Sequence, residues 1–231
     1  MTDPTRYSVG CSSVDALLGG GIETGTVTQV YGEPGAGKTN LALSMSVDVA
    51  TAGGRTLFID AEGISGTRLE QLIPERFDEN PVTDRIVIRD VYDFDEQEQA
   101  IKEAEAVASD LDLIVVDSIT GFYRLVRGTE AEEGETLRSV TNQVTHLLSI
   151  ARKYELAVLI TNQVFTDPEA DRIRPLGGQT LQHWSGAVIR LDRFRGGNRR
   201  ATLEKHRSLP AGESATFRIT EAGLVPVESF A

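Results

Sequence analysis

The chain is poor in lysine, cysteine and long apolar runs, and each shortage excludes a class of protein. One cysteine, Cys11, and 3 scattered histidines among 231 residues offer neither a disulfide framework nor a cluster for zinc. No apolar stretch reaches the length of a membrane span, and the sequence does not open with a basic segment followed by an apolar one. We therefore expect a cytoplasmic protein without a membrane segment.

Acidic residues outnumber basic ones by 35 to 23, which gives a formal net charge of −12. The lysines among them are only Lys38, Lys102, Lys153 and Lys205. An acidic chain with little lysine resembles the proteins of salt-accumulating halophiles, whose surfaces stay hydrated when charges are screened. The alternative is an acidic mesophilic protein with GC-rich codon usage. Neither alternative excludes binding of nucleic acid, because the charge of the local binding surface matters for it and not the net charge of the whole chain.

Apolar strands and amphipathic helices alternate along most of the chain. Strands are expected at 27–31, 56–59, 86–88, 113–116 and 157–160. Helices are expected from Lys38 to Gly53, from a capping box at Thr67 toward Phe77, at 95–108 and at 137–151. This alternation is typical of a mostly parallel, doubly wound α/β sheet, with ligands at the carboxyl ends of the strands.

Beyond Gly186 the pattern changes to shorter strand-like pieces at 187–191, 200–204, 215–219 and 223–227. Glycine, asparagine and proline separate these pieces, which predicts an antiparallel C-terminal extension of the same sheet. No repeat or linker divides the chain, and its length suits one α/β domain better than two. We expect a single domain over residues 1–231.

A phosphate-binding pattern, G-x-x-x-x-G-K-[ST], lies between the first long strand and the first long helix. It consists of Gly32, Glu33, Pro34, Gly35, Ala36, Gly37, Lys38 and Thr39, and Asn40 follows it. The glycines let the backbone N–H groups surround a phosphate, Lys38 brings positive charge to the β- and γ-phosphates, and the Thr39 hydroxyl can bind Mg²⁺. The sequence therefore predicts a nucleotide site at the start of this helix.

Polar residues at the ends of three other strands complete this prediction. Asp117 ends a buried strand and would hold Mg²⁺ opposite Thr39, although a carboxylate can also simply end a strand. Glu62 follows an earlier strand and is placed to polarise an attacking water, whereas Asp60 is assigned a structural or supporting role. From the residues alone, Gln163 is only a polar residue at a strand end.

Several segments, taken in order, resemble the core of RecA/RadA-type recombinases of the archaeal branch over nearly the whole chain. They are residues 10–15, 17–22, 32–39, 58–63, 115–118, 161–164 and 177–181. The resemblance implies a RecA-like P-loop ATPase that uses ATP and Mg²⁺. It also implies that Glu62 is the catalytic glutamate, that Gln163 senses the γ-phosphate beneath a second DNA loop, and that residues 122–136 form the first DNA loop.

Two departures indicate a paralogue rather than the main recombinase. About 26 residues precede the first strand, which leaves no room for the helix-hairpin-helix DNA-binding domain that RadA carries in front of its ATPase core. The first loop also has more glutamates than arginines, although Arg124 and Arg127 remain candidate DNA contacts. Similar archaeal paralogues bind ATP, hydrolyse it weakly, bind DNA and assist strand exchange. The implied partners are single-stranded or branched DNA, the RadA recombinase, a Holliday-junction resolvase and a second copy of this chain.

Residues 190–207 are locally basic in this acidic chain. The segment is either a solvated sheet edge or a phosphate-contacting surface, for which the candidate residues are Arg195, Arg199 and Arg200. Lys205 and Arg207 form a Lys-x-Arg pair like one that reaches a neighbouring subunit's γ-phosphate in KaiC-like and other RecA-fold ATPases. The function predicted is an ATP-binding accessory protein of homologous recombination and DNA repair. Its rivals are a DNA-dependent recombinase and a KaiC-like signalling ATPase or autokinase.

Overall fold

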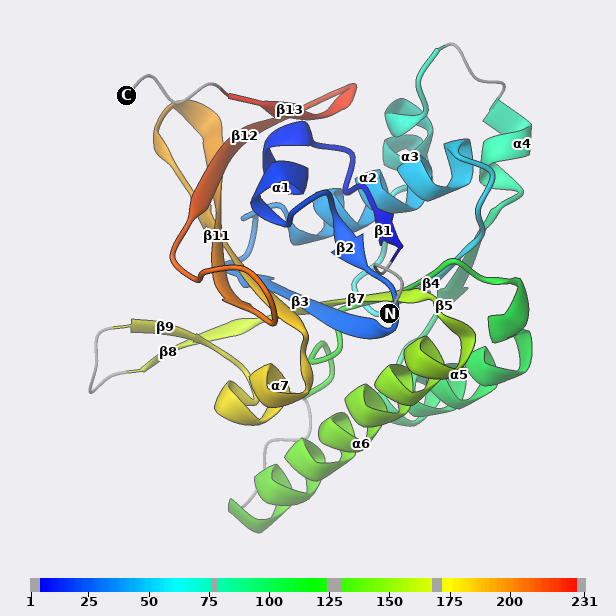
Figure 1. Ribbon diagram of the computed structural model, residues 1–231. Helices are drawn as coiled ribbons and strands as arrows, with labels where there is room; N and C mark the ends of the chain where they lie inside the picture. The colour runs from blue at the N-terminus through cyan, green and yellow to red at the C-terminus, as the bar shows by residue number, and fades with distance from the viewer. Residues whose placement is uncertain (1–4, 76–78, 124–129, 168–171, 228–231) are drawn as a thin grey trace.

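The protein is built around one long mixed sheet (Figure 1). The structure is a computed structural model that describes residues 5–75, 79–123, 130–167 and 172–227. Within these residues, nine strands follow the order β13-β12-β11-β10-β3-β7-β6-β4-β5. The strands are β3 (Thr26–Gly32), β4 (Thr56–Asp60), β5 (Ile86–Asp90), β6 (Leu113–Asp117), β7 (Ala157–Asn162), β10 (Ala187–Arg193), β11 (Asn198–His206), β12 (Ser214–Thr220) and β13 (Gly223–Pro226).

Pairing in the sheet changes from parallel to antiparallel near the C-terminus. The strands from β5 to β10 in this order pair parallel, and β11, β12 and β13 add antiparallel strands beyond β10. The predicted mostly parallel sheet with an antiparallel C-terminal extension is confirmed. In one detail the pairing differs from the expectation, because β10 is itself parallel to β3 and the antiparallel part begins only at β11.

Helices cover both faces of the sheet (Figure 1). One face carries α1 (Ser12–Leu17), α2 (Lys38–Thr51), α3 (Gly66–Leu72) and α4 (Glu79–Thr83). The other carries α5 (Phe94–Val107), α6 (Glu130–Tyr154) and α7 (Gly178–Trp184), with a short 3-10 turn, η1 (Ala108–Asp110), after α5. None of the helices in the described ranges combines the length and apolar character that a membrane span needs.

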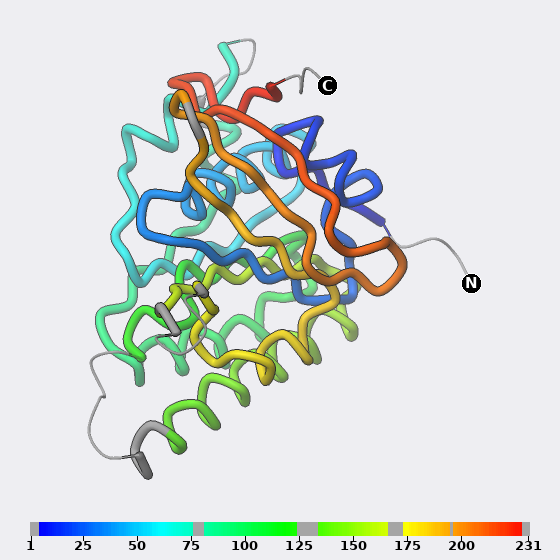
Figure 2. Tube along the Cα trace, turned by 90° about the vertical axis from the view of Figure 1, so that its left-hand side faces the viewer, coloured from blue at the N-terminus to red at the C-terminus, as the bar shows by residue number. Residues whose placement is uncertain are grey.

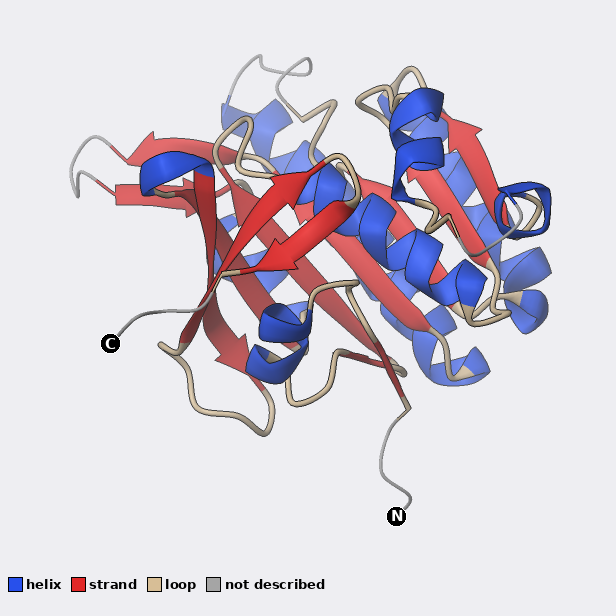
Figure 3. Cartoon of the chain, turned by 90° about the horizontal axis from the view of Figure 1, so that it is seen from above, coloured by secondary structure: helices blue, strands red, loops and turns tan. Residues whose placement is uncertain are grey.

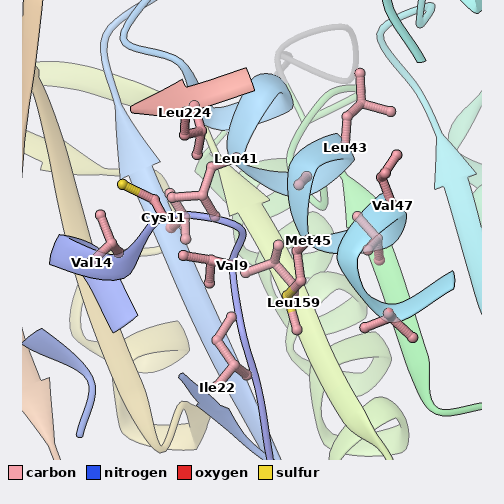
Figure 4. Close-up of a cluster of buried hydrophobic side chains, with 14 of the residues drawn as sticks. Val9, Cys11, Val14, Ile22, Leu41, Leu43, Met45, Val47, Leu159 and Leu224 are labelled. Carbon is pink, nitrogen blue, oxygen red and sulfur yellow. The ribbon is translucent and has the colours of Figure 1, made fainter. Parts of the chain in front are cut away.

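Alternating side chains of the buried strands supply two cores. Phe58 packs on the α2 side, whereas its neighbours Leu57 and Ile59 pack on the side of α5 and α6. Figure 4 shows part of the first core, in which Met45 of α2 and Leu159 of β7 lie together. Because each central strand is covered on both faces, its residues form continuous apolar runs.

Segments from the two ends of the chain lie side by side. The helix α1 packs against β12 and β13 (Figures 1 and 2). A small ribbon of β1 (Arg6–Tyr7) and β2 (Ile22–Glu23) lies nearby, and the Tyr7 hydroxyl donates to Asp112 Oδ1 at 2.6 Å. A second ribbon, β8 (Val164–Asp167) with β9 (Arg172–Pro175), projects from one end of the sheet (Figure 3).

Two sequence expectations about helices are corrected. The cap of α3 is Ser65, whose hydroxyl accepts from the Arg68 N–H, and not Thr67; the helix ends at Leu72 because Ile73 is extended ahead of Pro74. Phe77, toward which this helix was expected to run, lies outside the described residues. The first DNA loop was expected to reach residue 136, but α6 begins at Glu130.

Candidate nucleotide-binding site

The P-loop joins β3 to α2 at the carboxyl end of the sheet. All seven residues of β3 are buried, and β10 lies so close that a Cβ at Gly32 would come within 2.2 Å of the Leu191 carbonyl oxygen. Gly37 precedes α2 in the left-handed conformation, with φ of 107°, which strongly favours glycine. The backbone N–H groups at the start of α2 therefore converge on the loop, where an anion can bind.

Lys38 crosses the loop that precedes it. Its Nζ donates to the carbonyl oxygens of Gly32 at 2.9 Å and Glu33 at 3.3 Å. Burial lowers the pKa of Lys38, and the carboxylates of Glu62 and Asp117 act in the opposite direction. The ammonium is thus held at the mouth of the P-loop by carbonyl groups that a phosphate can replace.

Asp117, at the end of β6, is a fully buried carboxylate. The Thr161 hydroxyl donates to its Oδ1, while its Oδ2 has no hydrogen-bond partner among the described residues. Burial raises the pKa of Asp117 to about 6, and the nearby Glu62 and Asp60 carboxylates also raise it. The hydroxyls of Thr161 and Thr39 act in the opposite direction and lower this pKa. A buried carboxylate with a free oxygen beside the Thr39 hydroxyl fits a divalent cation, whose charge would offset the cost of burial.

Glu62 and Gln163 come from different strands and meet at the same edge of the sheet. Glu62 Oε1 accepts from Gln163 Nε2 at 3.0 Å and from Ser118 Oγ at 2.8 Å. Asp60 instead accepts from three backbone N–H groups, those of Glu62, Gly63 and Ile64. The structural role expected for Asp60 is confirmed, and its turn presents Glu62 beside the P-loop residues.

Gln163 also stands at the base of the β8–β9 ribbon. The Thr120 hydroxyl accepts from the Gln163 N–H at 3.1 Å and donates to Asn162 Oδ1 at 2.7 Å. Asn162 Nδ2 donates to the Leu176 carbonyl at 2.8 Å, and the Leu176 N–H donates back to the Gln163 carbonyl at 2.9 Å. These bonds join the site to the ribbon where the second DNA loop was expected.

Arg68 is a component of the site that sequence reasoning missed. Its Nε donates to Asn40 Oδ1 at 2.8 Å, and its guanidinium also donates to the carbonyls of Thr220 at 2.9 Å and Glu221 at 2.8 Å. Burial lowers the pKa of Arg68. The side chain therefore joins the helix after the P-loop to the β12–β13 turn. In the sequence, Arg68 was only an interior residue of the proposed capping box.

Lys205 and Arg207 lie at the opposite end of the sheet from the P-loop of their own chain. Lys205 pairs with Val188, whereas Gly32 of the P-loop pairs with Leu191 farther along β10. The Lys205 Nζ donates to the Gln182 carbonyl at 2.6 Å and the His183 carbonyl at 3.2 Å. Arg207 follows β11, and its Nε donates to Glu23 Oε2 at 2.5 Å.

The candidate DNA-contact residues are only partly described. Arg124 and Arg127 lie outside the described residues, and so does the side chain of Arg195. The Arg200 guanidinium lies 4.1 Å from the centre of the Phe194 ring, which is exposed. Arg199 lies beside the P-loop, with its Nε 4.0 Å from the position that a Cβ of Gly37 would take.

Fold and site together define a RecA-like P-loop nucleotide-binding domain. The Rad51 family model matches residues 4–227, and the chain belongs to this family. Members of the Rad51/RecA family are nucleotide-binding ATPases that typically need Mg²⁺.

The individual relatives agree with this assignment. The chain is 56% identical over 225 residues to the "DNA repair and recombination protein RadB" of Halobacterium salinarum, covering 96% of this chain and 95% of that protein. It is 42% identical to the protein of the same name from Archaeoglobus fulgidus, over 94% of this chain and 96% of the relative. A crystal structure described as the RadB recombinase superposes with a TM-score of 0.84 at 38% identity, covering 96% of this chain and all of that one. The sequence predicted a resemblance to an archaeal paralogue of the main recombinase, and these relatives confirm it. The Halobacterium relative comes from a halophile.

Proposed function

We propose that this chain is an ATP-binding accessory protein of homologous recombination and DNA repair in the cytoplasm. It binds DNA weakly, hydrolyses ATP slowly with little stimulation by DNA, and assists strand exchange by a partner recombinase. The observation that carries the nucleotide part is the meeting of Lys38, Thr39, Asp117, Glu62 and Gln163 at one end of the sheet. The recombination part rests on the family and on the names of the relatives.

The phosphates and their Mg²⁺ each have groups to bind them. The P-loop N–H groups and Lys38 would bind the phosphates, and Thr39 and Asp117 would hold Mg²⁺. When bound, Mg²⁺ neutralises charge on the β- and γ-phosphate oxygens. The Asp117 Oδ2, buried and without a partner among the described residues, is the atom that fits this ion. Asn40 orients Arg68 against the start of the same helix.

Glu62 positions and activates the attacking water. Its carboxylate is held by Ser118 and Gln163, which leaves its second oxygen to accept a proton. The amide of Gln163 donates to Glu62, and from this position it can exchange that bond for one to the γ-phosphate. Because Gln163 begins the link to the β8–β9 ribbon, this change of partner alters the ribbon as well.

Weak DNA binding follows from the charge distribution. Arg195 lies between β10 and β11, Arg199 and Arg200 follow in β11, and Arg124 and Arg127 belong to the first loop. The whole chain carries −12, so only local contacts favour the phosphate backbone. Stable loading then depends on RadA already bound to single-stranded or branched DNA, and a Holliday-junction resolvase is a further partner in this scheme.

Lys205 and Arg207 act on the nucleotide of a second copy of the chain. Their position at the end of the sheet opposite their own P-loop supports this role, because it leaves a neighbour's site as the one within reach. We further propose that residues 1–231 act as one RecA-like domain.

The decisive experiment compares strand exchange by RadA with and without this protein, as wild type and as Lys38→Ala. The proposal predicts that the wild-type chain binds ATP and raises the yield of strand exchange by RadA. The Lys38→Ala variant should do neither. Glu62→Gln should bind ATP but hydrolyse it more slowly. Strand exchange by the chain alone would establish the recombinase alternative. Transfer of phosphate from ATP to protein, without any effect on RadA, would establish the signalling ATPase.

A further inference from the structure

The turn between β10 and β11 brings two arginines to the P-loop. The strand β10 pairs with β3 as far as Gly32 and then continues to Arg193, so its last residues run alongside the loop. A Cβ at Gly35 would lie 4.0 Å from an Nη atom of Arg193, and a Cβ at Gly37 would lie 4.0 Å from Nε of Arg199. The basic segment therefore borders the loop that binds phosphate.

The two side chains share one face of the sheet. Arg193 and Arg199 are directly opposite each other in the β10–β11 pairing, and directly paired residues project to the same side. Arg200 projects to the other side, where it lies over the Phe194 ring. The strand thus separates a face directed at the P-loop from a face directed away from it.

The pairing of Arg193 with Arg199 is electrostatically unfavourable by itself. Like charges directly opposite each other destabilise an antiparallel pair, and among the described residues neither arginine forms an ion pair with a carboxylate. The Arg199 Nε is buried without a hydrogen-bond partner in that same part of the chain, and its Nη1 donates only to the carbonyls of Gly197 and Asn198. An anion beside these guanidinium groups would remove the repulsion.

The P-loop supplies the place for such an anion. We propose that Arg193 and Arg199 act in cis on the nucleotide, stabilising the negative charge of the phosphates that the P-loop binds. Arg199 is the main contributor because it is partly buried, where solvent and salt screen its charge less. This role rests on the proposed nucleotide function. It gives Arg199 a different task from Arg200, although the two are neighbours in a single basic segment.

The test is calorimetric titration with ATP and Mg²⁺ in the absence of DNA, at the lowest KCl concentration at which circular dichroism shows the wild type folded. The variants are Arg199→Gln, Arg193→Gln, Arg199→Lys and the matched control Arg200→Gln, with Lys38→Ala to verify the site. We expect Arg199→Gln to weaken ATP binding about tenfold and Arg193→Gln by less, as Coulomb interactions at a partly screened surface suggest. Arg199→Lys, which keeps the charge, should stay near wild type, and so should Arg200→Gln.

Several outcomes separate this role from its rivals. Unchanged ATP affinity in Arg199→Gln and Arg193→Gln, next to a loss in Lys38→Ala, would overturn the inference and leave the nucleotide site intact. Equal loss in Arg199→Lys and Arg199→Gln would show that the side chain only holds the turn through Gly197 and Asn198. Absence of ATP binding in the wild type would overturn the proposed function and this inference with it. A loss that shrinks as KCl rises would support the role of charge.

Discussion

Replacing Asp117 by asparagine should make the nucleotide-free protein more stable at neutral pH while removing its response to Mg²⁺ and ATP. The carboxyl is fully buried, and its pKa rises from 3.8 to about 6 in the folded chain. Because the folded-state pKa is above the unfolded one, ionisation destabilises the fold. This loss of stability is absent below about pH 4, grows between about pH 4 and about pH 6, and is complete above about pH 6.

The size of the effect follows from the same shift. A rise of about two pKa units corresponds to ~3 kcal/mol of lost stability at pH 7.5. Asparagine removes the charge and keeps an oxygen to accept from Thr161, but its amide places two N–H groups where Oδ2 has no partner among the described residues, at a cost of ~1–2 kcal/mol. The net gain is ~1 kcal/mol, or about 2–4 °C in Tm for a domain of this size.

The assay is thermal unfolding of wild type and Asp117→Asn at pH 5 and pH 7.5, at one fixed KCl concentration. The variant should melt higher at pH 7.5 and lose that advantage at pH 5, where the wild-type carboxyl is largely protonated. Mg²⁺ with ATP should raise the Tm of the wild type and leave the variant nearly unchanged. The reasoning would be refuted by a variant that is less stable at pH 7.5, or by an advantage that is the same at both pH values.

Three further predictions address the remaining parts of the molecule. Mixing Arg207→Ala with Lys38→Ala should restore part of the ATPase activity, because each defect lies on a different side of a subunit junction; no recovery from two folded, associating variants would argue against action in trans. Arg195→Ala/Arg200→Ala should flatten the slope of log K against log salt for single-stranded DNA by about 1.4, for two lost phosphate contacts, and an unchanged slope would exclude this surface. Phe58→Ala should lower the free energy of unfolding by about 3–5 kcal/mol because Phe58 is fully buried in β4, which denaturant titration can measure.

The central strands were the most predictable part of the fold. The pieces predicted at 27–31, 56–59 and 157–160 lie within β3, β4 and β7, because a strand covered on both faces forms an unbroken apolar run. The ribbons β1–β2 and β8–β9 could not be predicted, since their strands are only two and four residues long. The C-terminal extension was predicted, but the parallel pairing of β10 with β3 was not, because only tertiary contacts determine that pairing.

In the candidate site, the residues proposed to bind phosphate or metal carry a spacing signal, and the residues that position them do not. The P-loop pattern and the acidic strand end at Asp117 located one end of the sheet correctly. Ser118 lies in the segment 115–118, but nothing in the sequence predicts its contact with Glu62, and Arg68 reaches Asn40 only because α3 folds back over α2. The sequence also did not show that the basic segment, residues 190–207, has one face toward the P-loop and one face away from it. Alternation along a strand separates Arg199 from Arg200, but which face meets the P-loop depends on the position of β10 beside β3.

The place of β3 in the middle of the sheet has a consequence for synthesis on the ribosome. This strand ends at residue 32, yet its two partners are β7, which starts at residue 157, and β10, which starts at residue 187. Until those residues have left the exit tunnel, the P-loop strand is an apolar segment with both edges open, and such segments are prone to aggregate. The long sequence separation also makes folding slow, because loop closure must precede pairing. A nascent chain can therefore bind nucleotide only after β10 has been synthesised, so ATP binding would report that the chain has been completed at least to residue 193.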